Sequence, residues 1–368
     1  MTRWLRRLLV VGRVIAGVAA ISRLAKAATA ASPLRPATQA QDPTASHQQP
    51  EISVVVPARD EAERIGPVLA AIVGAPGVSE VIVVDDQSSD STAEIAAAAG
   101  ATVLSGVPLP AGWAGKAWAL QQGIEAAAGT WVVTLDADTR PDPQLPAALV
   151  SRVMSDRLDL LTVGGRFDCP TPGSRWLHPA MLTTLVYRFG PPGAPAAPHR
   201  AMANGQCMAF PRVALLERGA LAAVAGEVVE DIALARALAA DGARVAFLDG
   251  SEMLEVRMFE SLNDTWHGWG RSLALPGVEP RHRQVIDLAV VVLAQALPLP
   301  RLLTARADVV DVVLLALRMG TLAGTRRAYS RTDLAYWLSP LADVPAAAAI
   351  AQGIARRGRQ TWRGRTYA

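Results

Sequence analysis

Two aspartates separated by one residue follow an apolar run near the middle of the chain. The run Trp131 to Leu135 predicts a short buried strand, and Asp136-Ala137-Asp138 comes directly after it. Residues two apart in an extended segment point to the same side, so both carboxylates would face one crevice. Like charges repel strongly at low dielectric constant, and Mg²⁺ or Mn²⁺ would relieve this and bridge to a diphosphate. We therefore expect a metal site here, with an exposed acidic loop as the alternative.

A second acidic pair, Asp85-Asp86, follows the predicted strand Val81 to Val84. A carboxylate at the end of a strand can accept hydrogen bonds from a nucleobase or a ribose. A turn without a ligand explains the same residues, because Asp90 or Ser91 could cap the helix that follows. Both interpretations stay open from the sequence alone.

Lys116 is one of only two lysines in a chain with 34 arginines, and the other is Lys26 near the N-terminus. A compact ammonium differs from a guanidinium in how it contacts phosphate oxygens, and Lys116 lies beside Gly112 and Gly115. We expect Lys116 to contact phosphate, although chance explains a single lysine equally simply.

Two polar groups in the second half of the chain complete the candidates. Glu230-Asp231 opens a predicted helix over 232–239, where acids are common because they favour a helix N-terminus. The functional interpretation makes Asp231 the general base that takes a proton from an acceptor hydroxyl. Further on, residues 266–271 combine tryptophan, histidine and arginine, and Arg271 is expected to contact a diphosphate. His267 in the same segment is expected to be structural.

The elements that must position these residues alternate from residue 51 onward. The predicted strands are 52–56, 81–84, 101–104 and 131–135, and the predicted helices are 61–73, 92–99 and 117–128. Continuous apolar strands that alternate with helices indicate an α/β fold with a mostly parallel sheet covered on both faces. In such sheets the ligand lies beyond the carboxyl ends of the strands, where the acidic pairs are placed.

The distribution of charge favours a membrane over nucleic acid as a partner. Hydrophobic residues make up 51% of the chain. Residues 1–26 and 356–368 contain eleven of the 36 basic residues, and all 33 acidic residues lie between these segments. A nucleic-acid-binding protein would carry its positive charge on the folded body, so we expect no nucleic-acid partner. Basic ends are attracted to anionic headgroups by about 1 kcal/mol per side chain.

The hydrophobic pattern divides the chain into five segments. Residues 1–30 predict a membrane anchor or an interfacial helix, although Arg13 interrupts the apolar stretch. Residues 31–50 predict a flexible linker and 51–283 the α/β domain. Residues 284–355 predict membrane-associated helices, with buried helices of a soluble domain as the alternative. Residues 356–368 predict a basic tail, and such a tail indicates a protein of the cell membrane with its catalytic domain in the cytoplasm.

Four of these segments, in this order, resemble the family 2 glycosyltransferases, which have the GT-A fold. The similarity covers about residues 50–280, and each segment alone is weak. The matching segments are Pro57-Ala58-Arg59-Asp60-Glu61, the turn from Val84 to Thr92, Asp136-Ala137-Asp138 and Glu230-Asp231. The resemblance implies that Asp138 is the direct metal ligand and that Asp231 is the base in inverting transfer. It also implies substrate-binding roles, which fall on Glu61, Asp85, Asp86, Lys116, Asp136, Glu230 and Arg271.

The resemblance implies a nucleotide-sugar-binding GT-A domain, a nucleotide-diphosphate sugar donor and Mg²⁺ or Mn²⁺ as the cofactor. Trp269-Gly270-Arg271-Ser272 departs from the QxxRW motif of processive synthases, so polymer synthesis is not expected. Together with the apolar C-terminal segments, it is more similar to membrane-associated members that act on carotenoid or hopanoid-type lipids, which implies a lipid-like acceptor. The alternatives are a polyprenyl-phosphate glycosyltransferase, a catalytically silent nucleotide-binding membrane scaffold and a nucleotidyltransferase.

Overall fold

The computed structural model describes residues 3–36, 51–270, 272–356, 360–362 and 365–367. Residues 37–50 of the expected linker therefore lie outside the described residues, as do Arg271 and much of the basic tail. Within the tail, β11 (Gln360–Trp362) and β12 (Arg365–Tyr367) pair as antiparallel strands.

The centre of the molecule is a seven-stranded sheet. In spatial order its strands are β3 (Thr102–Ser105), β2 (Val78–Asp85), β1 (Ile52–Ala58), β4 (Trp131–Leu135), β8 (Cys207–Pro211), β6 (Leu160–Gly164) and β9 (Val245–Asp249). Every neighbouring pair is parallel except those made by β8, which runs antiparallel to β4 and β6. The predicted α/β fold with a mostly parallel sheet is confirmed, and all four predicted strands exist within two or three residues of their expected ends.

Helices cover both faces of this sheet, as the apolar strands predict. On β1, Val54 and Val56 belong to one core and Val55 to the other, because successive side chains point to opposite faces. The first core includes α2 (Ile65–Ile72), α3 (Thr92–Ala98) and α5 (Leu145–Asp156). The second includes α4 (Gly115–Ala126), α7 (Arg212–Glu217) and α8 (Glu230–Ala240). Because α2 begins at Ile65 rather than near residue 61, Glu61 lies in a loop.

A second, three-stranded sheet continues the first at the edge that carries the acidic residues. Its order is β5 (Thr139–Pro141), β10 (Leu254–Arg257) and β7 (Arg166–Asp168). Since β4 ends at Leu135 and β5 begins at Thr139, the segment Asp136-Ala137-Asp138 connects the two sheets.

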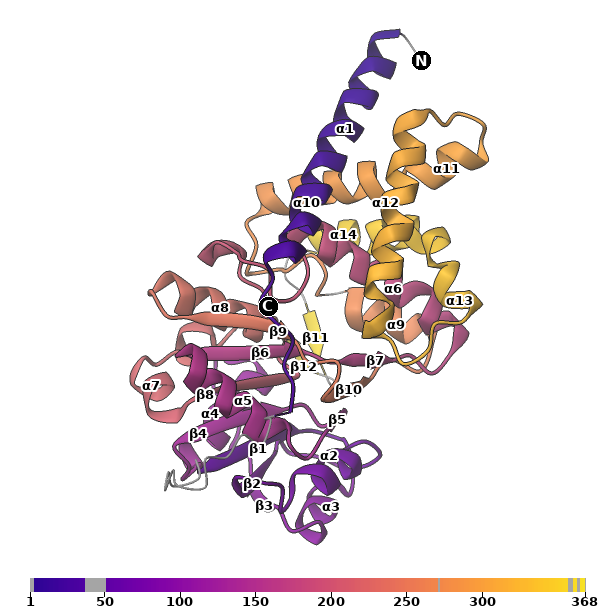
Figure 1. Cartoon of the computed structure of the whole chain (residues 1–368). Helices are drawn as coiled ribbons and strands as arrows, with labels where there is room; N and C mark the ends of the chain where they lie inside the picture. Colours follow the sequence, from indigo (N-terminus) through magenta and orange to yellow (C-terminus); the bar gives the residue numbers. More distant parts are fainter. Residues whose placement is uncertain (1–2, 37–50, 271, 357–359, 363–364, 368) are drawn as a thin grey trace.

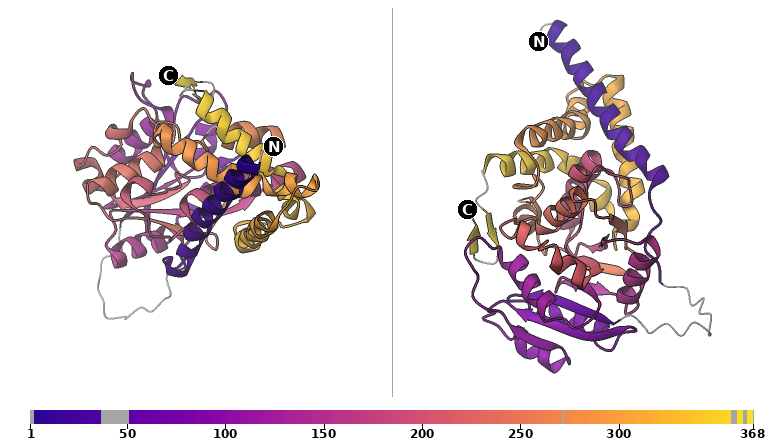
Figure 2. Two further views of the ribbon diagram at one scale, coloured as in Figure 1. Left: turned by 90° about the horizontal axis from the view of Figure 1, so that it is seen from above. Right: turned by 90° about the vertical axis from the view of Figure 1, so that its left-hand side faces the viewer.

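A group of helices packs beyond this edge. Its members are α1 (Arg3–Ala25), α6 (Pro172–Phe189), α9 (Leu262–Gly270), α10 (Arg281–Val291), α11 (Pro298–Leu303), α12 (Val309–Thr325), α13 (Leu334–Trp337) and α14 (Asp343–Ala355). Short connecting helices are found at Lys26–Thr29, Pro198–Arg200, Ala222–Val224, Val292–Ala296, Arg326–Ala328 and Ser339–Ala342. Helix α6 runs through the middle of the group, and the sheet lies at the opposite end of the molecule (Figure 1 and Figure 2, right).

Two helical stretches of the described residues are long and apolar enough to cross a membrane. They are Arg3–Thr29, with a mean hydropathy of 1.9, and Arg281–Leu303, with 1.7. Core helices and signal sequences pass the same criterion, so this is weak evidence for a span. Much of the large apolar surface of α1 and α12 is exposed, and Figure 1 shows α1 projecting beyond its neighbours. The exposed side chains include Trp4, Leu8, Val11, Ile15, Val18, Val309, Val312 and Val313.

The arginine inside the first apolar stretch has buried partners. Arg13 is fully buried, its guanidinium lies 2.6 Å from Asp308, and it also forms an ion pair with Asp311. Arg301 lies 2.9 Å from the other oxygen of Asp311. A buried charge is tolerated when it is paired in this way, so Arg13 fixes α1 against α11 and α12.

Candidate active site

One cavity of about 1610 Å³ brings together residues from distant parts of the sequence. It lies where the sheet, the loops at its edge and the helical group meet. Of the residues predicted from the sequence, its lining contains Glu61, Lys116, Asp136, Asp138, Glu230 and Asp231. Asp85 and Asp86 do not line it, and Arg271 lies outside the described residues. The two acidic pairs at 136–138 and 230–231 therefore share a cavity.

Lys116 holds these two acidic pairs together. It begins the first turn of α4, and its Nζ lies 2.7 Å from Asp136 Oδ1 and 3.3 Å from Glu230 Oε1. Burial opposes the charged ammonium, but the carboxylates of Asp136, Glu230 and Asp231 outweigh it and hold the pKa of Lys116 well above its usual range. Lys116 therefore carries a proton at neutral pH and already neutralises part of the acidic cluster.

The segment Asp136-Ala137-Asp138 is a turn rather than the expected extended continuation of the strand, but both aspartates line the same cavity. The Thr139 backbone N–H and hydroxyl both donate to the carbonyl oxygen of Asp136, at 3.1 and 2.7 Å. This hydrogen bonding forms a turn between β4 and β5. Asp136 turns toward Lys116, whereas the largely buried Asp138 is influenced by Glu61 as well as by Asp136.

The carboxylate of Asp138 is suited to bind a cation. Its buried Oδ1 atom has no hydrogen-bond partner among the described residues. Burial, followed by the charges of Asp136 and Glu61, raises the pKa of Asp138 to about 7. Within the described part of the chain, no group of three or more His, Cys, Asp or Glu side chains is arranged to hold a metal. The residues fit an ion bound by one or two carboxylates and completed by substrate phosphates, as is usual for Mg²⁺.

Asp231 lies at the start of α8, next to the loop that precedes β8. Its Oδ2 accepts a hydrogen bond of 2.6 Å from the Gly205 backbone N–H. Burial raises the pKa of Asp231, although Lys116 and two backbone hydrogen bonds act in the opposite direction. A raised pKa makes the carboxylate a stronger base. Among the described residues, its second oxygen accepts a hydrogen bond only from the N–H of Ile232, at 2.8 Å.

Gly205 is required by close packing. A Cβ atom there would lie 3.1 Å from Asp231 Cβ and 3.2 Å from Lys116 Nζ, tighter than most real contacts. Asn204, Gly205 and Gln206 line the cavity, and the structure gives a steric reason for the glycine.

Two of the arginines that line the cavity, Arg59 and Arg64, lie beside the acidic residues in sequence segments where only Glu61 was predicted. Arg59 follows β1 and Arg64 precedes α2, and both contribute to the lining. Arg59 donates to the carbonyl oxygen of Asp86 at 2.7 Å and lies 3.8 Å from its carboxylate. Asp86 is therefore connected to the cavity through Arg59. The residue type was visible inside the Pro57 to Glu61 segment, but its orientation depends on the pairing of β1 with β2.

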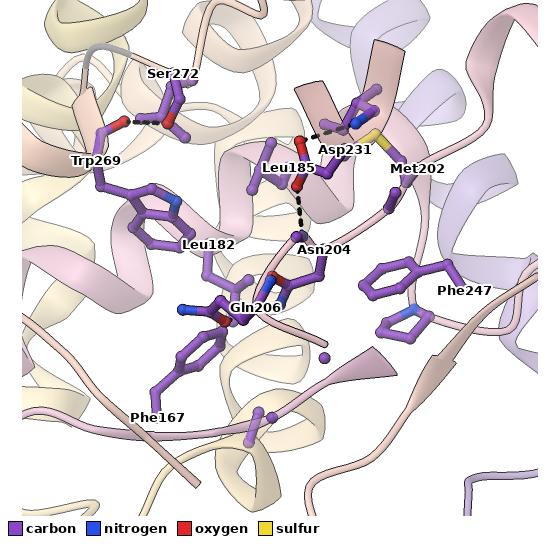
Figure 3. Close-up of a pocket in the computed structure, with 18 of the residues that line it drawn as sticks. Phe167, Leu182, Leu185, Met202, Asn204, Gln206, Asp231, Phe247, Trp269 and Ser272 are labelled. Atoms are coloured by element: carbon purple, nitrogen blue, oxygen red, sulfur yellow. Dashed lines mark hydrogen bonds between the residues drawn. The ribbon is translucent and has the colours of Figure 1, made fainter. Parts of the chain in front are cut away.

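The other part of the cavity is apolar, and the sequence did not predict it. Leu182 and Leu185 come from α6, Leu317 from α12, and Trp269 from α9. Figure 3 shows Leu182, Leu185 and Trp269 with Phe167 in the same space as the carboxylate of Asp231. The Trp269 ring stacks on His178, with ring centroids 3.9 Å apart. We call this part, formed by α6, α9 and α12, the apolar arm of the cavity.

This combination defines a class of protein. A mostly parallel sheet, covered on both faces and with carboxylates gathered beyond its strand ends, is a fold of the GT-A glycosyltransferase type. Residues 53–219 match the family model described as Glycosyl transferase family 2. The match covers less than half of the chain, and this part is similar to the family 2 glycosyltransferases.

Curated relatives match within a limited region. The chain is 36% identical over 96 residues to a 4,4'-diaponeurosporenoate glycosyltransferase of Staphylococcus aureus (strain bovine RF122 / ET3-1), which covers 26% of each chain. It is 39% identical over 88 residues to the protein of the same description from strain USA300, which covers 24% of each. The matched region therefore spans about a quarter of the length of these relatives.

A solved structure resembles nearly the whole chain. The mannosyltransferase PcManGT from Pyrobaculum calidifontis, in complex with GDP-Man and Mn²⁺, superposes with a TM-score of 0.55 at 20% identity. The alignment covers 95% of this chain and 98% of that one. At this identity the likeness is one of fold, and it extends to the helical group.

Proposed function

We propose that the protein is an inverting glycosyltransferase that moves a sugar from a nucleoside diphosphate sugar to a lipid-like acceptor at the cytoplasmic face of the cell membrane. The observation that carries the proposal is the single cavity in which the acidic residues and the apolar arm meet. The names of the Staphylococcus aureus relatives, which include a long apolar acid, support an apolar acceptor. The exposed apolar faces of α1 and α12 support membrane association.

The donor would bind at the acidic end of the cavity. Asp138 would hold a divalent cation together with the donor diphosphate, and the bound ion would stabilise the negative charge of the departing nucleoside diphosphate. Lys116, which keeps its proton, supplies a second fixed positive charge at this end. Fixed charges aimed at a developing negative charge lower the barrier because they need no reorganisation during the reaction.

Asp231 would remove the proton of the acceptor hydroxyl as that oxygen attacks the anomeric carbon. The oxygen–carbon bond forms while the bond to the departing phosphate oxygen breaks, so a single displacement inverts the configuration. The Gly205 N–H fixes one oxygen of Asp231 at 2.6 Å. Positioning a base in this way typically contributes about 10²–10⁴-fold to the rate.

The acceptor chain would lie in the apolar arm, along a face of α12 that carries two glycines. Gly320 and Gly324 both line the cavity, and a Cβ atom at either would meet nothing within 4 Å. A larger side chain at these positions would therefore enter open space in the arm. Glycine inside a helix costs about 0.5–1 kcal/mol relative to alanine, so replacing it is not expected to destabilise α12.

The test fills the arm without touching the acidic end. Gly320→Leu and Gly324→Leu should each lower transfer to a membrane lipid extract by more than about tenfold, while the affinity for a UDP- or GDP-sugar stays unchanged. Gly66→Leu is the matched control, because Gly66 is also helical, has nothing within 4 Å of its Cβ position and does not line the cavity. Transfer at the wild-type rate in both cavity variants would contradict an acceptor in the arm.

A further inference from the structure

A second pocket, separate from the catalytic cavity, lies where α1 and α10 pack together. Its volume is about 200 Å³, enough for a phosphate group, and its lining consists of Arg23, His199, Arg200, Arg283, Ile286 and Asp287. Arg23 is near the C-terminal end of α1, and Arg283 is in the first turn of α10. The two stretches that are apolar enough to cross a membrane thus have basic residues at this shared pocket.

Positive charge exceeds negative charge around this pocket. Asp287 is contacted by two guanidinium groups, those of Arg200 at 2.9 Å and Arg23 at 3.6 Å. Glu279, just behind it, is also contacted by two, those of Arg200 at 3.1 Å and Arg236 at 2.8 Å. Three guanidinium groups, those of Arg23, Arg200 and Arg236, therefore face these two carboxylates.

Further basic groups have no acidic partner. Arg283 and His199 line the pocket, and neither forms an ion pair within the part of the chain that the structure describes. Behind the pocket, Arg188 is 3% exposed, its Nε donates to the Thr184 carbonyl, and its buried Nη2 has no hydrogen-bond partner among the described residues. Burial lowers the pKa of Arg188 to about 10, which leaves it charged at neutral pH. A buried cation with an unpaired nitrogen, such as Arg188, is costly unless an anion joins it.

We propose that this pocket binds the phosphate of an anionic phospholipid headgroup. Guanidinium groups bind phosphate oxygens through short, charge-assisted hydrogen bonds, often in pairs. The N-terminal end of α10 adds the positive end of a helix dipole. A lipid is favoured over a free anion because the exposed side chain of Ile286 lines the pocket and would meet the acyl chains, and α1, which supplies Arg23, carries further exposed apolar side chains such as Ile21.

The pocket is also connected to the catalytic cavity. The Arg200 guanidinium lies 4.1 Å from the centre of the Phe189 ring, and Phe189 lines the cavity that contains Asp231. A bound headgroup would fix the position of Arg200, and through it the position of Phe189 in the wall of the cavity. This inference rests on the membrane association proposed above but does not require sugar transfer.

The experiment measures ligand-induced stabilisation of the full chain in a neutral detergent without phosphate. Thermal unfolding is followed with dihexanoylphosphatidylglycerol, dihexanoylphosphatidylcholine or inorganic phosphate. A ligand that binds only the folded state raises the unfolding midpoint with its concentration. We expect phosphatidylglycerol to raise the midpoint clearly more than either other compound, Arg283→Gln to lose at least half of that shift, and Arg283→Lys to retain most of it.

Arg281→Gln is the matched control, since Arg281 lies in the same helical turn, carries the same charge and does not line the pocket. Equal loss in Arg281→Gln and Arg283→Gln would show diffuse surface attraction and overturn the proposal. An equal shift with inorganic phosphate would assign the site to a soluble anion, and an equal shift with phosphatidylcholine would remove the anion requirement. If phosphatidylglycerol raises the unfolding midpoint of Asp231→Asn as it does that of the wild type, the phosphate site is supported independently of sugar transfer.

Discussion

At the scale of single residues, Lys116 has the most connected position in the cavity. It forms ion pairs with Asp136 and Glu230, and the negative charge of Asp231 also raises its pKa. Its carboxylate partners come from two segments nearly a hundred residues apart. The positive charge of Lys116 offsets the repulsion between these carboxylates and so allows the two segments to lie close together. When a diphosphate enters, the same ammonium can offset the charge of phosphate oxygens.

Lys116→Gln should therefore affect both stability and donor binding. Removing the ammonium leaves Asp136 and Glu230 facing each other, and an uncompensated polar group costs about 1–3 kcal/mol. The free energy of unfolding by urea and the affinity for the donor measured by calorimetry should both fall. Lys116→Arg keeps the charge and should therefore retain more of the wild-type stability than of the wild-type donor affinity. An unchanged donor affinity in Lys116→Gln would contradict the phosphate role.

Asp231→Asn should remove transfer while the donor still binds. The amide has nearly the shape of the carboxylate but cannot accept a proton, so we expect a loss of about 10²–10⁴-fold in kcat. Asp241→Asn is the control, because Asp241 lies at the other end of α8 and is exposed. Measured by product formation at saturating donor, equal activity of the two variants would exclude Asp231 as the base.

The pH dependence of transfer follows from the same carboxyl. Burial raises the pKa of Asp231 above that of an exposed aspartate, which is about 3.9. A base acts in its deprotonated form, so kcat/KM should be constant well above this pKa and fall about tenfold per pH unit below it. The decline should begin at a higher pH than for an exposed aspartate. A profile of kcat/KM that stays flat on the acid side would argue against this assignment.

Residue types and order predicted much of this site. The acidic pairs at 136–138 and 230–231 and the isolated Lys116 were recognisable because few residues suit phosphate or metal chemistry. Arg59 was not, because its role depends on which strand lies beside which. The close approach of Gly205 to Asp231 exists only in the folded chain.

At the scale of elements, local pattern predicted the first half of the sheet and missed the second. The apolar runs before residue 136 alternate with helices, and the structure has strands there. Strands β6, β8 and β9 follow less regular connections, and β8 runs antiparallel. The Asp136 to Asp138 turn was also beyond local pattern, because it depends on Thr139 and on β5 pairing with β10.

The attachment of α1 through Arg13 leads to a prediction at this scale. Arg13→Leu removes the partner of Asp308 and one partner of Asp311, although Arg301 remains in contact with both. Breaking a buried pair costs about 3–5 kcal/mol, and we expect the lower end of this range. Thermal unfolding should show the loss, whereas Arg6→Leu, on an exposed position of the same helix, should have little effect. Equal midpoints for the two variants would contradict the structural role of Arg13.

At the scale of the whole molecule, the sheet and the helical group contribute to one cavity. Acidic residues come from the sheet edge, while the apolar arm comes from α6, α9 and α12. The sequence predicted apolar helices over residues 284–355, either as membrane attachment or as buried helices of a soluble domain. Their place in the lining of the cavity could not be predicted, because it depends on packing between segments more than a hundred residues apart.

The proposed requirement for a divalent ion would be a property of the assembled cavity. Removing metal with a chelator should abolish donor consumption, and adding Mn²⁺ or Mg²⁺ should restore it. Asp138→Ala should lose this restoration, because it removes the buried oxygen that has no other partner among the described residues. Full consumption in the chelated wild type would exclude the metal site.

The most direct measurement follows a labelled sugar into lipid. The full chain in phospholipid nanodiscs is incubated with labelled UDP- and GDP-sugars, Mn²⁺ and a membrane lipid extract, and label in the organic phase is counted. If the acidic residues and the apolar arm form one active site, label enters the lipid with the wild type and not with Asp231→Asn or Gly320→Leu. Label that enters equally with all three proteins, or donor that binds without any transfer, would contradict this account.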